Sequence, residues 1–290
     1  MFRKVAVGIS GGVDSAVAAL LLKRANYQVE GVFMRNWDSN YESGLCSDEK
    51  DFEDASFVCQ AKLLQPLDLY KDQTFFLSQV KQFSLRKCMF PLANLLKSQV
   101  REIARKEGLL RVADKRDSTG ICFIGKNKFK KFIEDFIQTR KGQFIDIDNG
   151  KVVGEHSGIH KWTVGQRCCL KDWKDAYFVF KKDMTTNNIY VVPGTKHPAL
   201  WNNICFTETP HWICQMPVEI KENHVLHCYF RFQHTKPLVS CRVVTNSEGL
   251  TILLDEPLRA LTEGQYAVFY KDGECLGSAK MKSICHNLNF

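Results

Sequence analysis

Hydrophobic residues near the start of the chain follow the pattern of an alternating α/β domain. Residues 5–9 form a short apolar run bounded by glycine, which is typical of a strand buried on both faces of a sheet. A helix is predicted over about residues 14–24, where apolar side chains share one stripe, and a second strand over residues 27–34. Ser47 can cap a further helix. Strand, helix, strand and helix at this spacing predict a parallel sheet.

Two more helices are predicted before the pattern changes. One covers about residues 97–107 and ends at Gly108, because glycine commonly terminates helices. The other covers about residues 127–138, where lysines surround the start of an apolar stripe. The members of that stripe are Phe129, Phe132, Ile133 and Phe136. Both helices extend the α/β part of the chain.

Alternating polar and apolar residues replace the helical pattern near Gly142. Two alternating segments flank Asn149-Gly150, a dipeptide that predicts a two-residue β-hairpin turn. Residues 177–181 and 189–192 predict a second hairpin in the same way. This part of the chain is therefore expected to form a small β-rich domain.

Short strands dominate the last third of the chain, where their regular spacing indicates a small closed or nearly closed barrel. They are predicted over residues 226–232, 239–244, 250–254, 266–270 and about 279–284. We therefore expect an α/β domain over residues 1–141, a small central β-domain over residues 142–198 and a C-terminal β-barrel over residues 199–290.

Composition and charge permit a nucleic-acid partner without requiring one. The chain of 290 residues carries 40 Lys and Arg against 32 Asp and Glu, a formal charge of +8. A basic surface gains affinity for phosphate chains by releasing counterions, but a slightly basic soluble enzyme would have the same charge. No apolar run reaches the roughly 20 residues that span a bilayer, so no membrane partner is expected. The first residues lead directly into a strand and leave no room for a cleavable leader of the usual form.

The twelve cysteines are scattered, and none forms a C-x-x-C pair. A zinc ribbon or thioredoxin-like site is therefore not expected. His224 and His227 have the spacing of a metal-ligand pair, but they lie in a strand-like context without a third ligand, so we predict no metal site formed by protein side chains alone. Most of the cysteines are expected to be reduced thiols that pack in the core, Cys168 and Cys169 among them.

A glycine- and serine-rich loop between the first strand and the first helix is the clearest candidate for chemistry. Glycines let backbone N–H groups approach an anion, serines add hydroxyl donors, and the helix N-terminus adds positive potential. The sequence is neither a dinucleotide-binding nor a Walker motif. It resembles the pyrophosphate loop of ATP pyrophosphatases, which implies ATP as substrate and Asp14 as a residue that helps to hold Mg²⁺. The expected nucleotide-binding residues are Gly8, Ile9, Ser10, Gly11, Gly12, Val13, Asp14 and Ser15.

Four further motifs, spread over most of the chain, resemble those of the tRNA 2-thiouridylases. Lys71-Asp72-Gln73 opens a segment that continues as Thr74-Phe75-Phe76-Leu77, and Asp117-Ser118-Thr119-Gly120-Ile121 runs into Cys122-Phe123-Ile124-Gly125. The other two are Thr163-Val164-Gly165-Gln166-Arg167 and Gly264-Gln265-Tyr266-Ala267-Val268-Phe269-Tyr270. The amino-acid sequence between Trp37 and Cys59 is more similar to that of animal mitochondrial members of the family than to that of bacterial ones.

The resemblance implies a fold, a reaction and a location. The first domain would be an ATP pyrophosphatase domain with a Rossmann-like parallel sheet. The reaction would adenylate the 2-oxygen of a wobble uridine and replace that oxygen with sulfur, releasing AMP and pyrophosphate. Sulfur would arrive as a persulfide from a sulfur-relay protein or a cysteine desulfurase, tRNA would be the other partner, and the protein would work in the mitochondrion.

The resemblance also implies roles for particular residues. Cys122 would carry the persulfide, and its setting between two glycines and before a lysine-rich helix start should favour the thiolate. Met34 would contact adenine through its backbone. The expected tRNA contacts are Lys71, Asp72, Gln73, Arg231, Phe232 and Gln265. Without the resemblance, Phe232 would be interpreted as a core strand residue and Cys122 as a buried thiol.

The chain departs from its family after Gln60. Thiouridylases carry two further segments there, N-P-D-x-x-C-N with the second reactive cysteine and A-T-G-H-Y near the nucleotide, and neither occurs here. Ala61 instead leads within ten residues to Lys71. The sequence therefore predicts that an internal block is missing, and the alternative function is a catalytically impaired variant that still binds tRNA and ATP. Another kind of ATP pyrophosphatase is disfavoured by the motif around Cys122.

Overall fold

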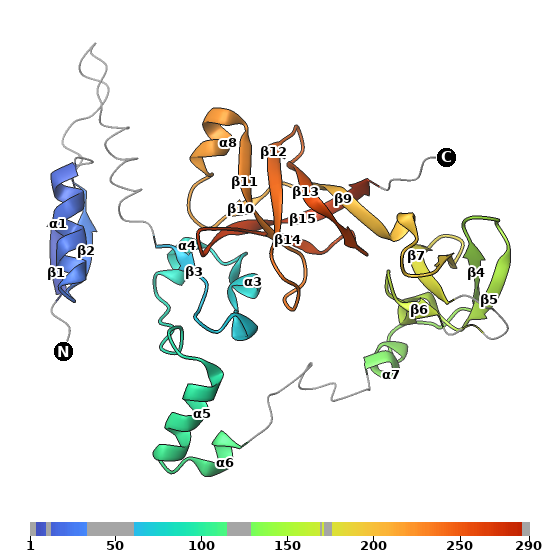
Figure 1. Cartoon of the computed structure of the whole chain (residues 1–290), viewed down its shortest axis with the longest axis horizontal. Coiled ribbons are helices and arrows are strands. Elements are labelled where there is room, and N and C mark those ends of the chain that lie inside the picture. Colours follow the sequence, from blue (N-terminus) through green and yellow to red (C-terminus); the bar gives the residue numbers. More distant parts are fainter. Residues whose placement is uncertain are drawn as a thin grey trace. The chain divides into compact units, whose positions relative to one another are not determined.

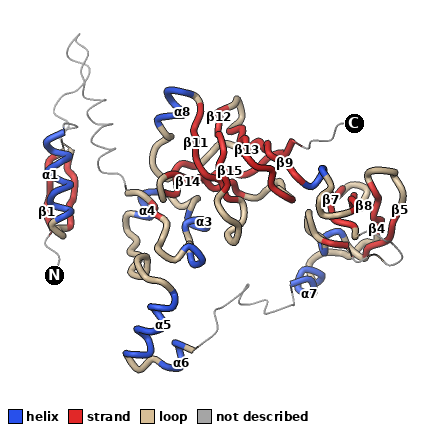
Figure 2. The backbone as a smooth tube through the Cα atoms, viewed as in Figure 1, coloured by secondary structure: helices blue, strands red, loops and turns tan. Residues whose placement is uncertain are grey.

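The computed structural model describes residues 4–9, 13–33, 61–114, 129–168, 170 and 176–285. The chain divides into two compact units, and each is described by itself. One unit comprises Met1–Lys62 with Gln82–Lys87, and the other comprises Leu63–Lys81 with Cys88–Phe290. Figures 1 and 2 show the helices and strands of both.

The N-terminal unit contains a strand–helix–strand element, as the sequence predicts. Strands β1 (Lys4–Gly8) and β2 (Gln28–Val32) pair in parallel along their whole length, and α1 (Val13–Arg24) connects them. Asn26 adopts a left-handed conformation with φ of 61° in the turn that follows α1, a conformation that asparagine tolerates better than most residues. The prediction of a parallel α/β element is confirmed.

The prediction that the first strand is buried on both faces is wrong for this structure. Exposed and partly buried residues alternate along β1, and Ile9 is the one nearly inaccessible residue described between residues 4 and 33. On α1, Val17 and Leu21 are 46% and 58% exposed. Two strands and one helix bury little apolar surface, because a sheet of this class needs cover on both faces.

Short helices occupy most of the segment between the N-terminal unit and the β-domains. The predicted helix at residues 97–107 is confirmed as α5, and Gly108 follows it with φ of 74°. The helix predicted at residues 127–138 is described only as α7, which ends at Glu134. The elements are β3 (Leu63–Leu64), η1 (Leu69–Lys71), α3 (Thr74–Leu77), α4 (Gln82–Leu85), α5 (Lys97–Lys106), α6 (Leu110–Ala113) and α7 (Phe129–Glu134). Of these, α4 belongs to the N-terminal unit.

A five-stranded sheet forms the central β-domain and contains both predicted hairpins. The turn at Asn149-Gly150 is longer than the two residues predicted, because Asp146 N donates to the Lys151 carbonyl and Gly150 N donates to the Asp146 carbonyl. The strand order is β5-β4-β8-β7-β6, and the β4–β8 pair is parallel whereas the others are antiparallel. Its core includes Phe144, Val179 and Ile189, all of which are almost inaccessible. The strands are β4 (Gly142–Asp146), β5 (Val152–His156), β6 (Arg167–Cys168), β7 (Tyr177–Asp183) and β8 (Asn188–Pro193), with η2 (Ile159–Lys161) between β5 and β6.

The last part of the chain forms the predicted closed barrel. Hydrogen-bonded neighbours follow the order β15-β14-β11-β12-β13-β9, and β9 returns to pair with β15. Inward-facing side chains such as Phe230, Ile252 and Phe269 fill the interior, so the barrel is packed rather than hollow. Its elements are η3 (Pro198–Leu200), β9 (Trp201–Thr207), β10 (His211–Trp212), α8 (Val218–Asn223), β11 (Val225–Arg231), β12 (Val239–Thr245), β13 (Leu250–Arg259), β14 (Tyr266–Lys271) and β15 (Glu274–Cys285).

Candidate functional site

The predicted nucleotide loop lies between the carboxyl end of β1 and the N-terminus of α1. Ser10, Gly11 and Gly12 lie outside the described residues, and α1 begins at Val13 with Asp14 in its first turn. A Cβ atom added at Gly8 would meet none of the described residues within 4 Å. Backbone N–H groups at the start of a helix suit an anion.

Ile9 contributes differently from the other residues of this loop. Its backbone N–H donates to the Val32 carbonyl at 2.9 Å, which extends the β1–β2 pairing by one hydrogen bond. That N–H is therefore occupied in this structure, and Ile9 itself is buried. The described geometry gives Ile9 a role in holding the loop rather than in donating to phosphate.

Met34 and Cys122 lie outside the described residues, as does the whole motif around Cys122. The roles of Met34 in adenine contact and of Cys122 in sulfur transfer therefore stay predictions. The described candidates for tRNA contact lie at the end of η1, in the turn between η1 and α3, and on the barrel.

Asp72 occupies the centre of a hydrogen-bonded cluster on the barrel. It is fully buried, and its carboxylate accepts four hydrogen bonds. The donors are Gln65 Nε2 at 2.9 Å, Thr74 N at 2.8 Å, Thr74 Oγ1 at 2.6 Å and Arg231 Nη1 at 3.3 Å. Lys71 and Gln73, which flank Asp72 in the chain, are both exposed. Of the three residues of this motif, the outer two can meet a ligand from solvent.

Arg231 lies at the end of β11 and is the ionic partner of Asp72. Its side chain is 7% exposed, and its guanidinium carbon lies 5.3 Å from the ring centre of Tyr270. Burial raises the pKa of the Tyr270 hydroxyl, which keeps Tyr270 neutral. Arg231 is thus enclosed by a carboxylate and an aromatic ring.

Phe232 and Gln265, the other two predicted tRNA contacts, are less accessible than Lys71 and Gln73. Phe232 is 4% exposed and stacks on Phe230 in the barrel core, with ring centres 6.0 Å apart. A base cannot stack on a ring that is enclosed in this way. Gln265 is partly buried, and its Oε1 has no hydrogen-bond partner among the described residues.

Sequence reasoning missed several residues of the cluster around Asp72. His234 Nε2 lies 2.7 Å from the Asp72 carbonyl oxygen, and the hydroxyl oxygens of Thr74 and Tyr270 are hydrogen-bonded 3.2 Å apart. The ring of Phe76 stacks on His234 with centres 5.1 Å apart. No local pattern indicates these contacts, because the partners are more than 150 residues apart in the sequence.

The four buried cysteines of the barrel, Cys205, Cys228, Cys241 and Cys275, have the properties of structural residues. Burial raises the pKa of the Cys205 thiol to about 12, and burial likewise raises that of Cys275 to about 12. Cys228 and Cys241 face each other across β11 and β12 with their sulfurs 3.6 Å apart, and Cys228 raises the pKa of Cys241. Protonated buried thiols are poor nucleophiles. Among the described residues, no three His, Cys, Asp or Glu side chains are grouped to hold a metal ion.

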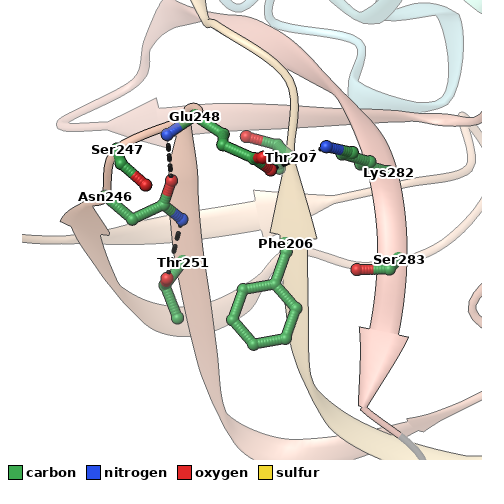
Figure 3. A pocket seen from close by; sticks show the side chains of 8 residues that line it. All are labelled: Phe206, Thr207, Asn246, Ser247, Glu248, Thr251, Lys282 and Ser283. Atoms are coloured by element: carbon green, nitrogen blue, oxygen red, sulfur yellow. Dashed lines mark hydrogen bonds and ion pairs between the residues drawn. The ribbon is translucent and has the colours of Figure 1, made fainter.

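A groove of about 450 Å³ lies on the barrel beside the turn between β12 and β13 (Figure 3). Asn246 Oδ1 accepts from the backbone N–H groups of Glu248 and Gly249, and its Nδ2 donates to Thr251 Oγ1. Lys282 pairs with Glu248 at 2.6 Å. These polar groups bond to one another, so the groove lies beside a surface turn that its own hydrogen bonds stabilise. In the part of the chain that the structure describes, no helix has the length and apolar character needed to cross a membrane.

Comparison with known proteins places all three parts of the chain in one family. A family model described as the tRNA methyl transferase HUP domain matches residues 3–62 and 60–126. The tRNA methyl transferase PRC-barrel domain matches residues 130–193, and the aminomethyltransferase β-barrel domain matches residues 202–281. The expected fold class, an ATP-pyrophosphatase-type domain followed by two β-domains, is confirmed.

Similar proteins cover almost the whole chain. Mitochondrial tRNA-specific 2-thiouridylase 1 of Drosophila melanogaster is 40% identical over 98% of this chain and 95% of its own length. The chain belongs to the tRNA-specific 2-thiouridylase family. The Homo sapiens mitochondrial tRNA-specific 2-thiouridylase 1 is 35% identical over 96% of this chain and 90% of its own length. The family member from Alkaliphilus oremlandii, tRNA-specific 2-thiouridylase MnmA, is 33% identical, with 97% of each chain covered.

The match to the thiouridylase family is interrupted near residue 60. The HUP domain matches in two pieces, residues 3–62 and 60–126, which meet at residues 60–62. The alignment with the Drosophila relative extends over 368 residues, whereas this chain has 290. Thiouridylase residues without a counterpart in this chain therefore lie within the aligned region.

Proposed function

We propose that this chain is a mitochondrial tRNA-uridine 2-sulfurtransferase, which replaces the 2-oxygen of a wobble uridine with sulfur at the expense of ATP. The observation that carries the proposal is the similarity to thiouridylases over nearly the whole chain, in all three domains. The fly and human relatives are both named as mitochondrial, which supports the location.

The nucleotide would bind at the loop after β1. The backbone at Gly8 has no described residue close to it, and residues 10–13 would supply N–H and hydroxyl donors to the phosphates. Asp14, in the first turn of α1, would hold Mg²⁺ with the pyrophosphate. The uridine 2-oxygen would attack the α-phosphorus and displace pyrophosphate, so that AMP becomes the leaving group on the base.

Cys122 would deliver the sulfur. Its persulfide, received from a sulfur-relay protein or a cysteine desulfurase, would attack the activated uridine carbon and expel AMP. The bond between the two sulfurs must then break, which requires a second thiol to attack the Cys122 sulfur and form a disulfide with it. Cys205 and Cys275 of the barrel are buried, and burial raises the pKa of both thiols, so these two cysteines are unsuited to that second role.

A second candidate function follows from the interruption near residue 60. The segment that carries the second thiol in thiouridylases is absent from this sequence, and the HUP domain matches in two pieces that meet there. The exposed apolar side chains on α1 and β2 also fit the loss of covering structure. We therefore propose, as the alternative, that this chain binds tRNA and ATP but turns over poorly.

Thiolation of a tRNA transcript tests the role of Cys122. The full chain is incubated with unmodified tRNA, ATP, Mg²⁺, cysteine and a cysteine desulfurase, and 2-thiouridine is measured by mass spectrometry. Cys122→Ser should abolish even a first turnover. Cys285→Ser, which removes an exposed cysteine at the end of β15, should leave the yield unchanged. A Cys122→Ser variant that still forms 2-thiouridine would refute the assignment.

A further inference from the structure

The segment that contains Lys71-Asp72-Gln73 is attached to the outside of the barrel. Strand β3 pairs with the hairpin end of β15, and Gln65 N donates to the Gly273 carbonyl at 2.8 Å. Farther along the segment, Gln79 Nε2 donates to Ser278 Oγ at 2.7 Å. These contacts at both ends hold the intervening residues against β11, β14 and β15.

Asp72 and Arg231 meet in the middle of this attachment. Removing a carboxylate and a guanidinium from water is costly, and the cost is met only when both are paired and hydrogen-bonded. Asp72 satisfies that condition with four donors, one of which is Arg231 Nη1. Arg231 depends on Asp72 for its ionic partner, because its buried Nε has no hydrogen-bond partner among the described residues. Such a pair resists separation, because either partner left alone would be an uncompensated buried charge.

The burial of Arg231 favours a role in holding the Lys71–Gln73 segment on the barrel over a role in binding RNA. An arginine that binds phosphate presents its guanidinium edge to the backbone of the nucleic acid. Here the guanidinium is 7% exposed, is bonded to Asp72 and lies over Tyr270. His234 also holds this segment on the barrel, because its Nε2 forms a hydrogen bond with the Asp72 carbonyl and its ring stacks on Phe76.

We propose that Asp72 and Arg231 are positioning residues: they form a buried ionic clamp that fixes Lys71 and Gln73 on the barrel surface and do not themselves contact tRNA. With Asp72 directed toward the outer face of the barrel, the residues on either side of it are exposed to solvent. The Lys71 ammonium and the Gln73 amide then meet a phosphate or base from a fixed backbone, which reduces the entropy lost on binding. The part of this inference that names tRNA rests on the proposed function.

The clamp is tested first without tRNA, by a double-mutant cycle on the full chain. Asp72→Asn and Arg231→Met should each lower the Tm by roughly 10 °C, because each leaves one buried charge without its partner. The double variant should lose much less than the sum of the two, since no unpaired charge remains. Arg242→Met, which removes an exposed arginine from the neighbouring strand β12, is the matched control and should leave Tm nearly unchanged. Additive losses would refute the clamp.

Filter binding of tRNA at several salt concentrations then separates positioning from direct contact. Lys71→Ala should reduce the slope of log affinity against log salt by about 1, the loss of one phosphate contact. The double variant should keep the parent affinity within about threefold and the parent slope, because Lys71 is again held in place. If Arg231 instead touches phosphate, the double variant stays weak and its slope falls by about 1, which would overturn the positioning role.

Failure of the proposed function would look different from failure of the clamp. If the parent chain shows no salt-dependent binding of tRNA, the tRNA-binding function is wrong for this chain and the tRNA part of the inference falls with it. The double-mutant cycle on Tm decides separately whether the ionic clamp exists.

Discussion

Burial determines which ionisable side chains can act as ligands and which hold the structure. Asp72 and Arg231 carry opposite charges, yet both are enclosed, whereas Lys71 beside them is exposed. His156 in the central sheet is a second buried polar residue. Its Nδ1 accepts from the Gly158 N–H, and its Nε2 lies 3.1 Å from the Asn187 carbonyl oxygen. Only the neutral ring satisfies both contacts, with Nε2 as the donor.

Burial lowers the pKa of His156, and this gives the central β-domain a pH dependence. The folded-state pKa lies below the unfolded value of about 6.5, so the unfolded chain binds the proton more readily. Stability should therefore be complete above about pH 6.5 and decline as the pH falls below it. Tm measured between pH 5 and 7.5 should show this decline, and His156→Gln should flatten it. His227→Gln, at an exposed position on β11, should leave the decline intact; an equal flattening would contradict the assignment.

Asp14 gives a second prediction at the scale of one residue. If the loop after β1 holds ATP and Mg²⁺, Asp14→Asn should abolish the rise in Tm that ATP with Mg²⁺ produces, since a ligand that binds only the folded state stabilises it, and the gain vanishes when the ligand no longer binds. Lys23→Met, in the last turn of the same helix, controls for the loss of a charge on α1 and should keep the shift. Equal shifts in the parent and in Asp14→Asn would remove this residue from nucleotide binding.

Strand pairing around the barrel depends on glycines at the element scale. Gly277 in β15 has φ of 146°, and a Cβ atom there would lie 2.1 Å from the His211 carbonyl oxygen of the paired strand β10. Gly273, in the turn before β15, also has positive φ but has open space around it. The two glycines therefore separate the effect of backbone conformation from the effect of close approach.

Substitution of these glycines by alanine should have unequal effects. Gly273→Ala should cost about 1 kcal/mol, the usual penalty for a side chain in the left-handed region. Gly277→Ala should cost about 3 kcal/mol or more, because the strained conformation is combined with a clash against the backbone of β10. Urea unfolding of both variants measures the difference. Equal losses would show that β10 can move aside and that its pairing with β15 contributes little.

At the scale of the whole molecule, the barrel and the N-terminal unit differ in how much they bury. The barrel closes around a core in which Phe230, Val243 and Ala267 are inaccessible. The described part of the N-terminal unit has two paired strands, and apolar side chains such as Leu20 and Leu21 remain about half exposed. The two-piece match of the HUP domain supplies a reason, since residues that relatives carry near position 60 have no counterpart here.

Restoring the block that thiouridylases carry near residue 60 should restore catalysis. The present chain should make at most a trace of 2-thiouridine under multiple-turnover conditions, because the proposed mechanism needs a second thiol to release sulfur from Cys122. A chain with the relatives' block inserted between Gln60 and Ala61 should turn over continuously, whereas the same insertion with its cysteine changed to serine should not. Time courses with excess ATP and persulfide donor provide the measurement. Similar rates with and without the block would contradict the two-thiol argument.

Local sequence patterns were sufficient to predict the helices, strands and turns that form between residues close together in the chain. The parallel pair β1–β2, the hairpin at Asn149-Gly150 and helix α5 all follow from periodicity and turn chemistry, because these contacts are close in the sequence. The motifs of the chain were also sufficient to indicate the thiouridylase family. Alternation along β11 places Phe232 on the same face as Phe230, and the structure confirms it as a core residue of the barrel.

Only the tertiary structure decided the role of Arg231. The same alternation would place Arg231 outside the barrel and in water, since its strand neighbours His227 and Tyr229 are exposed. Arg231 is buried because the segment around Asp72, 159 residues earlier in the sequence, covers that face and supplies a carboxylate. No pattern with a period of 2 or 3.6 residues carries information across that separation. The burial of a charge depends on which distant segment covers it, and the fold alone determines that.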